Sequence, residues 1–202
     1  ARVRSLTGER VGGAATPKSF PTPPKALSLK LTHSAQSNGY YCGPATTAMV
    51  IRMSGGKETS RHDSSHTMSQ TRLAGSTYLA TTRNGTSMHR IPIALDRWMG
   101  LKTKVYAKPS TKPIKNLTAG AIGVLRHGVA FGTRENKNRK HYNFHPDNKT
   151  IDHFIAGYGY SSHGSTIKYA DPATSVWKDV EKTGSMSASV MAGYVAPWGM
   201  IA

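Results

Sequence analysis

The sequence contains little cysteine, little acid and no long apolar run. Cys42 is the single cysteine among 202 residues, which excludes an internal disulfide and a cysteine-rich zinc site. No run of about 18 apolar residues occurs, so no membrane-spanning helix is expected. Shorter apolar groups recur at helix and strand spacing, and together with the chain length they predict one folded domain.

Acidic residues are scarce relative to basic ones. Ten Asp and Glu stand against 27 Lys and Arg, which gives a formal net charge of +17. A positive surface attracts anionic polymers, so loose binding to the polymers of a cell envelope is expected. The densest basic cluster, within residues 133–140, has no nucleic-acid motif around it and is interpreted as a solvated loop, so no specific nucleic-acid partner is expected. The first residue is Ala1 rather than methionine, which favours a processed bacterial protein, secreted or associated with the cell envelope.

Proline and glycine are frequent near the N-terminus. Residues 1–28 hold four prolines and the pair Gly12-Gly13 but little apolar periodicity, which predicts a flexible arm or the remnant of a pro-segment. Residues 29–202 are predicted to form the domain, entered by a short strand at 27–31.

The order of helical and alternating segments predicts an α+β fold. Helices are expected at 44–54, 69–81 and 91–99, and strands at 102–107, 121–131, 152–160, 166–170 and 189–195. Helices that come first and strands that follow predict N-terminal helices packed on an antiparallel sheet formed by the C-terminal half.

The single thiol is the first candidate for chemistry. Cys42 is followed by Gly43-Pro44, and proline is favoured in the first turn of a helix, so the thiol is predicted at a helix N-terminus. Free backbone N–H groups and the helix dipole favour a thiolate there. The amide of Gln36, six residues earlier, and the Cys42 N–H are predicted to form an oxyanion hole for a tetrahedral intermediate.

Nine histidines are candidates for the base that such a thiol needs. His153 opens a predicted strand, and the next strand ends just before Asp171. If these strands are neighbours, the Asp171 carboxylate can hold the imidazole in the tautomer that accepts the thiol proton. Asp152 is expected on the opposite face of its strand, outside the site. His127 is the strongest rival base, but no residue downstream is placed to orient it.

Two His-x-x-x-His pairs are the metal-binding candidates, His62 with His66 and His141 with His145. Both pairs lie in polar stretches rich in helix breakers or charge and have no clear third ligand. They are interpreted as solvated loops, and no metal or cofactor is expected.

Two segments, QSNGYYCGPATTAMVI and DHFIAGYGYSSHGSTIKYADPA, resemble the papain superfamily. They are most similar to the bacteriocin-processing (double-glycine leader) cysteine peptidases and their stand-alone exported bacterial relatives. The stretch LAGSTYLATTRNGTSMHRIPIALDRWMG extends the similarity to roughly residues 30–199. The resemblance implies a papain-like fold and an acyl-enzyme mechanism, with Cys42 as nucleophile, His153 as general base, Asp171 as orienting carboxylate and Gln36 in the oxyanion hole.

The sequence therefore predicts an exported, monomeric papain-like thiol hydrolase that cleaves peptide or isopeptide amide bonds in a peptide or protein substrate. Two alternatives stay open. An amine acceptor in place of water would make the same site a transpeptidase or a transglutaminase-like acyltransferase. A basic envelope-binding protein that keeps the fold without turnover would bind anionic polymers independently of Cys42.

Overall fold

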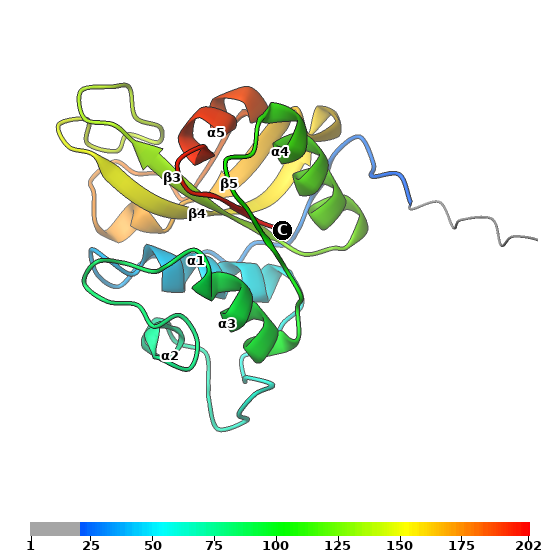
Figure 1. Ribbon diagram of the computed structural model, residues 1–202, viewed down its shortest axis with the longest axis vertical. Coiled ribbons are helices and arrows are strands. Elements are labelled where there is room, and N and C mark those ends of the chain that lie inside the picture. Colours follow the sequence, from blue (N-terminus) through cyan, green and yellow to red (C-terminus); the bar gives the residue numbers. More distant parts are fainter. Residues whose placement is uncertain (1–20) are drawn as a thin grey trace, which may run out of the picture.

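One antiparallel sheet forms the centre of the molecule in the computed structural model, which describes residues 21–202 (Figure 1). The strand order is β2-β7-β3-β4-β5-β6, and β1 pairs with β4. The strands are β1 (Leu27–Ser28), β2 (Val105–Tyr106), β3 (Val129–Glu135), β4 (Ile151–Ser161), β5 (Thr166–Ala170), β6 (Thr183–Ser187) and β7 (Gly199–Ile201). The predicted α+β class is confirmed, because every pairing between these strands is antiparallel.

Helices cover the sheet from two sides (Figure 1). One group consists of α1 (Cys42–Met53), α2 (Gln70–Ala74) and α3 (Arg90–Met99). The other consists of α4 (Thr111–Thr118), which continues into a π-helical segment (Ala119–Val124), and α5 (Ala188–Val195). Short 3-10 turns follow β4 and β5, at Ser162–Gly164 and Pro172–Ser175. None of the helices within residues 21–202 is long and apolar enough to cross a membrane.

Apolar side chains on both faces of the sheet join it to the two groups of helices. In β4, Phe154 and Ala156 belong to the core shared with α1, α2 and α3. Ile155, between them, belongs to the core shared with α4 and α5. This alternation follows from the two-residue period of a strand. It holds β4 between the two layers, so the residues at its start have a fixed position relative to α1.

Helix α1 begins at Cys42, as predicted from the proline that follows. Pro44 lies in the first turn, where its missing N–H costs no hydrogen bond. The helix is buried on nearly all sides, and the Thr46 hydroxyl donates to the Phe154 carbonyl at 3.0 Å. The chain turns away at Gly55, whose φ of 78° is readily adopted by glycine. The hydrogen bond from Thr46 attaches the start of α1 directly to β4.

The last residues of the predicted N-terminal arm lie against the domain. Beyond the pairing of β1 with β4, the Tyr160 hydroxyl donates to the Pro24 carbonyl at 2.9 Å. The backbone N–H of His163 donates to the Lys25 carbonyl at 2.8 Å. Residues 1–20, with the Gly12-Gly13 pair, lie outside the described residues, so the division into arm and domain stays a prediction.

Two predicted strands are wrong. Residues 189–195 form α5, in which Ser187 caps the N-terminus and Met191 and Val195 are buried on one side. Their β-branched and aromatic residues alternate like a strand, but the buried positions follow helical spacing. Residues 121–131 are split: the small residues of the first part extend α4 into the π-helical segment, and β3 starts only at Val129. His127 therefore lies between the two elements and not on a strand.

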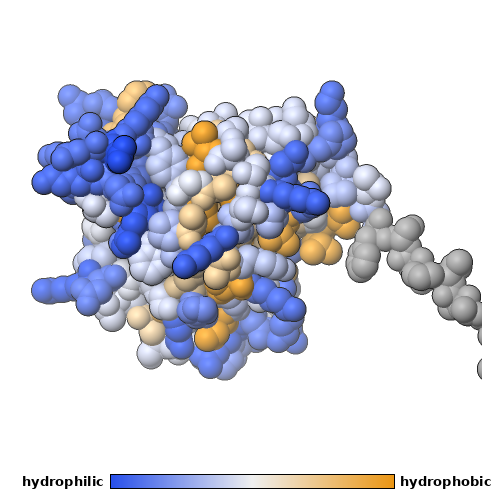
Figure 2. Space-filling view, turned by 45° about the horizontal axis from the view of Figure 1, so that its top comes forward, coloured by the Kyte–Doolittle hydropathy of each residue, from blue (hydrophilic) through white to orange (hydrophobic). Residues whose placement is uncertain are grey.

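Two other elements are shorter than predicted. The helix expected at 69–81 covers only α2, because Gly75 takes an extended conformation and ends it. The strand expected at 102–107 is reduced to β2, which pairs with β7 at the edge of the sheet. The basic cluster is partly β3, since Arg134 lies in that strand, whereas the residues from 136 to 140 are exposed. Figure 2 shows hydrophilic side chains over this loop between β3 and β4, at the upper left.

Candidate active site

Cys42 lies at the wall of a cavity of about 590 Å³. The thiol-bearing residue is 8% exposed, so the side chain is nearly buried but reaches the cavity. His153, from the start of β4, lines the same cavity. The remaining wall is formed by Ala80, Thr82, Asn84, Gly85, Thr86, Ser87, Met88, His89, Gly132, Asp152, Phe154 and Trp198.

Gly43 allows one wall of this cavity to approach the start of α1. A Cβ atom at this position would lie 2.2 Å from the Thr86 hydroxyl oxygen, closer than any real contact. Thr86 is held in place by a hydrogen bond of 2.8 Å between its hydroxyl and that of Thr81. The glycine after Cys42 is therefore explained by packing beside the thiol.

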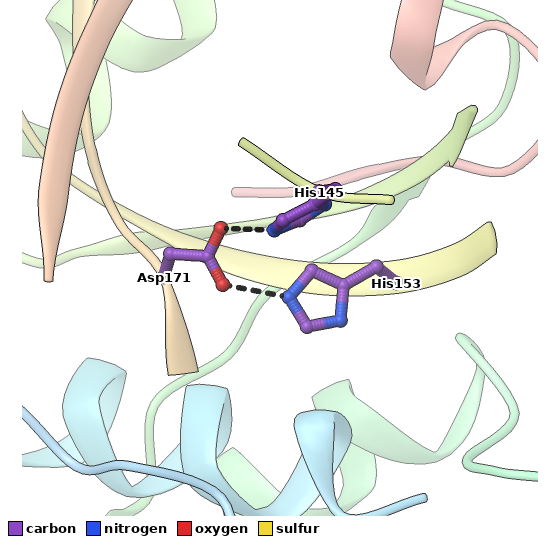
Figure 3. A group of neighbouring side chains, drawn as sticks. All are labelled: His145, His153 and Asp171. Carbon is purple, nitrogen blue, oxygen red and sulfur yellow. Dashed lines mark hydrogen bonds and ion pairs between the residues drawn. The ribbon is translucent and has the colours of Figure 1, made fainter. Parts of the chain in front are cut away.

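His153 and Asp171 form the charged part of the site (Figure 3). They come from adjacent strands, because β4 pairs with β5 and Asp171 directly follows β5. His153 Nε2 donates to Asp171 Oδ1 at 2.9 Å, and both residues are buried. The backbone N–H of Ala173 donates to the same oxygen at 2.9 Å. The structure thus brings together three residues singled out in the sequence, Cys42, His153 and Asp171.

The electrostatics of this group favour an imidazolium next to a carboxylate. Burial by itself lowers the pKa of His153, but the charge and hydrogen bond of Asp171 and the interaction with Cys42 outweigh it and raise the pKa to about 10. Burial acts on Asp171 in the opposite direction. The charge of His153 and the hydrogen bonds from His145 and His153 nevertheless hold the pKa of the Asp171 carboxyl far below its usual range. The proton in the hydrogen bond between His153 and Asp171 therefore belongs to the imidazole.

Gln36 is buried near the turn that leads into α1. Its Nε2 donates to the Asn38 carbonyl at 2.7 Å, and its Oε1 has no hydrogen-bond partner. The Gln36 backbone N–H donates to the Pro172 carbonyl at 2.8 Å, which connects this segment to the turn after Asp171. Gln36 does not line the cavity that Cys42 and His153 share, so its place in an oxyanion hole stays a prediction.

The sequence interpretation of His145 as part of a solvated loop is wrong. His145 is buried, its Nε2 donates to Asp171 Oδ2 at 2.9 Å, and its Nδ1 donates to Glu135 Oε2 at 2.6 Å. Asn143 Nδ2 also donates to Asp171 Oδ2, at 2.9 Å. Sequence reasoning missed these residues because they lie in a polar, charged segment. The one sequence signal that could have pointed to a buried partner for His145 is Glu135, one of the few acidic residues, which follows the predicted apolar strand.

Asp152 has its own partners, separate from His153. Arg134, its partner in the register of β3 and β4, donates to both Asp152 oxygens at 2.7 and 2.8 Å. Trp198 Nε1 donates to Asp152 Oδ1 at 2.6 Å, and the Arg134 guanidinium lies over the Trp198 ring at 5.2 Å. The prediction that Asp152 lies outside the site is wrong in part, because Asp152 lines the same cavity as Cys42 and His153 although its hydrogen bonds go to Arg134 and Trp198.

Among residues 21–202, one group of side chains has the proximity that a metal ion needs. The ligand atoms of His145, His153 and Asp171 lie within 4.8 Å of one another. Both carboxylate oxygens of Asp171 already accept hydrogen bonds from the two imidazoles, and these bonds account for the arrangement without an ion. Neither His-x-x-x-His pair is helical, and His66 instead bonds to the Tyr78 hydroxyl at 2.9 Å.

Comparisons with known proteins identify the family and the fold of the chain. The model of the Peptidase_C39-like family matches residues 28–196. A protein of Bacillus anthracis assigned as a C39-like peptidase has a solved structure that is similar with a TM-score of 0.55 at 9% identity, over 86% of this chain and 95% of that chain. A cysteine protease of Carica candamarcensis in complex with E-64 has a TM-score of 0.45 at 13% identity, over 88% and 96% of the two chains. No curated protein matches the sequence.

The fold and the family match together define a papain-like cysteine peptidase. The family model covers most of the chain, from the end of the predicted arm to α5. The chain therefore belongs to the Peptidase_C39-like family, as the sequence motifs predict.

Proposed function

We propose that this peptidase cleaves peptide or isopeptide amide bonds through a covalent acyl-enzyme on Cys42. One observation carries the proposal: the thiol at the start of α1 and the His153 imidazole line one cavity, and the far side of that imidazole bonds to a buried carboxylate. A nucleophile, a base and a group that orients the base are the parts that thiol catalysis requires.

The reaction begins from the form in which the His153 imidazole already holds the proton given up by the Cys42 thiol. The thiolate sulfur attacks the carbonyl carbon, and the carbonyl electron pair moves to oxygen in a tetrahedral intermediate. When the intermediate collapses, the C–N bond breaks and the imidazolium of His153 gives its proton to the leaving amine. A water molecule then attacks the thioester while His153 accepts its proton, and the C–S bond breaks to release the carboxylic acid product and to restore the Cys42 thiolate beside the imidazolium.

The surroundings of His153 support this division of roles. Asp171 holds Nε2, which leaves Nδ1 as the nitrogen that exchanges protons with the thiol. The raised pKa of His153 means that the imidazolium persists at neutral pH, as the protonation of a leaving amine requires. The free backbone N–H groups at the start of α1 add a positive potential beside the sulfur.

Gln36 is the proposed side-chain donor to the oxyanion. Its buried Nε2 uses one N–H on the Asn38 carbonyl, and the second N–H is available for a substrate oxygen. Loss of one oxyanion donor costs about 10²–10³ in rate, so Gln36→Ala is expected to lower turnover by this factor. Full activity of Gln36→Ala would remove it from the mechanism.

The test is turnover of a peptide mixture, followed by mass spectrometry, for the native protein, Cys42→Ala and His153→Ala. Both variants are expected to lose turnover while they remain folded, and His62→Ala, which changes an exposed histidine, serves as the control. Turnover by folded Cys42→Ala would contradict the proposal. The same digests with an added primary amine identify the acceptor: free carboxylate products indicate hydrolysis, and amine adducts indicate an acyltransferase.

A second prediction concerns location. We propose that the protein acts outside the cell or at its envelope, which the net charge of +17 supports through attraction to anionic polymers. Fractionation of the producing cells, with detection of the protein in medium, envelope and cytoplasm, tests this. A protein found only in the cytoplasm would contradict it.

A further inference from the structure

A second buried histidine occupies the side of Asp171 that His153 leaves free. His145 lies in the loop between β3 and β4, and it bonds through Nε2 to Asp171 Oδ2 (Figure 3). Its Nδ1 bonds to Glu135 Oε2. Glu135, at the end of β3, also accepts the backbone N–H of Tyr142 at 2.8 Å. The buried side chains thus form one row from Glu135 through His145 and Asp171 to His153.

Hydrogen-bond chemistry determines the protons in this row. A neutral imidazole carries one N–H, but each nitrogen of His145 faces an oxygen of a carboxyl group. With both carboxylates ionised, His145 must therefore carry a proton on each nitrogen. Burial lowers the pKa of His145, but the hydrogen bonds to Asp171 and Glu135 and the charge of Asp171 outweigh it and raise the pKa. Negative and positive groups then alternate along the row.

The loop backbone places two donors on one carboxylate oxygen. Asn143 and Phe144 both have left-handed conformations, with φ of 53° and 59°. Such a conformation is strained for phenylalanine, and the Phe144 side chain is exposed at 69% and gains little from burial. These two residues turn the chain so that the side chains on either side of Phe144, Asn143 and His145, both donate to Asp171 Oδ2.

Aromatic side chains fix the plane of the second imidazole. The ring of His145 lies 4.7 Å from that of Trp177 and 4.8 Å from that of Tyr142, measured between centroids. The rings of His145 and His153 are nearly perpendicular, at 84°, with centroids 5.3 Å apart. These aromatic neighbours therefore limit the rotation of the His145 ring, whose Nε2 faces Asp171 Oδ2.

We propose that His145 is a positioning residue of the active site: by donating to Asp171 Oδ2 it holds the carboxylate in the orientation that directs His153 toward Cys42. This proposal rests on the proposed roles of Cys42, His153 and Asp171. His145 itself lies outside the cavity and contacts the reacting atoms only through Asp171 and His153.

Two substitutions separate this role from the charge and from packing. In His145→Gln the amide nitrogen takes the place of Nε2 and keeps a donor on Asp171. In His145→Asn the shorter amide takes the place of Nδ1, so it keeps the bond to Glu135 and loses the one to Asp171. Both variants remove the charge and part of the ring volume, so a difference between them reports on the bond to Asp171.

The rate of Cys42 alkylation by iodoacetamide between pH 5 and 9 is the readout, because it needs no substrate. At pH 6 we expect His145→Asn to react about 10–100-fold more slowly than the native protein, the usual cost of losing a group that orients a site residue. His145→Gln is expected to keep most of the native rate. Equal rates in all three proteins, or an equal loss in both variants, would overturn the proposal.

His153→Ala distinguishes a failure of this proposal from a failure of the proposed function. If native Cys42 reacts at pH 6 no faster than in His153→Ala, the proposed thiol–imidazole pair is wrong. If it reacts faster, but His145→Asn matches the native rate, only the role of His145 is wrong.

A measurement on the native protein covers the case in which a variant fails to fold. Proton–nitrogen NMR spectra of the histidine rings at pH 7 are expected to show protons on both nitrogens of His145. An unprotonated Nε2 cannot donate to Asp171, and its observation would overturn the proposal.

Discussion

Replacement of Asp171 by asparagine tests whether the buried carboxylate holds the site together. Asp171 is fully buried, and its two oxygens accept four hydrogen bonds of 2.9 Å, from His153, Ala173, His145 and Asn143. An asparagine provides one acceptor oxygen in place of two. The amide nitrogen of the asparagine must then face N–H donors at the place of one carboxylate oxygen. This conflict is relieved only if His145 loses a proton and its ring nitrogen accepts a hydrogen bond from the amide.

The magnitude follows from the two bonds to imidazolium. A hydrogen bond to a charged group contributes about 1.5–3 kcal/mol, and a neutral one about 0.5–1.5 kcal/mol. The loss of charge at two bonds therefore lowers the free energy of unfolding by about 2–3 kcal/mol near pH 7. With a urea dependence of about 2 kcal/mol per molar, the midpoint of unfolding falls by about 1–1.5 M.

Urea unfolding of Asp171→Asn, followed by circular dichroism, measures this change. Asp152→Asn is the matched control, because Asp152 is also hydrogen-bonded but its side chain is 44% exposed. A surface pair contributes about 0–1 kcal/mol, so the control midpoint should shift by less than about 0.5 M. Equal midpoints for Asp171→Asn and Asp152→Asn would refute the argument that the buried carboxylate stabilises the fold through its imidazolium partners.

Three further predictions concern pH, packing and the N-terminal segment. The raised pKa of His153 contributes stability that is complete below the pKa of the unfolded state, about 6.5, and is lost as the pH rises through about 10. The free energy of unfolding should therefore fall between pH 6.5 and 10. Urea midpoints at pH 6, 8 and 10 that do not decrease would contradict this prediction. Gly43→Ala forces Thr86 to move and should lower the free energy of unfolding by about 1–3 kcal/mol, measured as a lower urea midpoint. In the Gly43→Ala background, Thr86→Gly should restore the midpoint, whereas Thr86→Ser, which keeps the clashing hydroxyl, should not. Tyr160→Phe removes the bond to the Pro24 carbonyl and should lower stability by about 0.5–1.5 kcal/mol while it speeds proteolysis near residues 21–26; unchanged proteolysis would show that this bond does not hold the segment.

Elements whose signals are local could be predicted from the sequence. The start of α1 follows from Gly43-Pro44, because proline restricts the first turn of a helix whatever surrounds it. The strands β4 and β5 follow from alternating apolar residues, and their adjacency places His153 near Asp171. Because these signals are local, the family resemblance could also be recognised from two short segments, and the family match confirms it.

Elements whose local signals are ambiguous needed the tertiary structure. Residues 189–195 alternate like a strand, yet they lie in α5 because burial of Met191 and Val195 against the sheet favours helical spacing. Propensity is a weak signal in such a short segment, and packing decides between the two periods.

The sequence by itself determined the candidate site residues: one thiol, a glutamine six residues before it, and a histidine and an aspartate at the ends of predicted neighbouring strands. Only the tertiary structure decided what surrounds them. His145 and Glu135 are ten residues apart, and His145 reaches Asp171, 26 residues further along the chain, because two left-handed residues turn the loop back into the core. Contacts of this kind depend on where a loop closes in space, and no local spacing in the sequence encodes them.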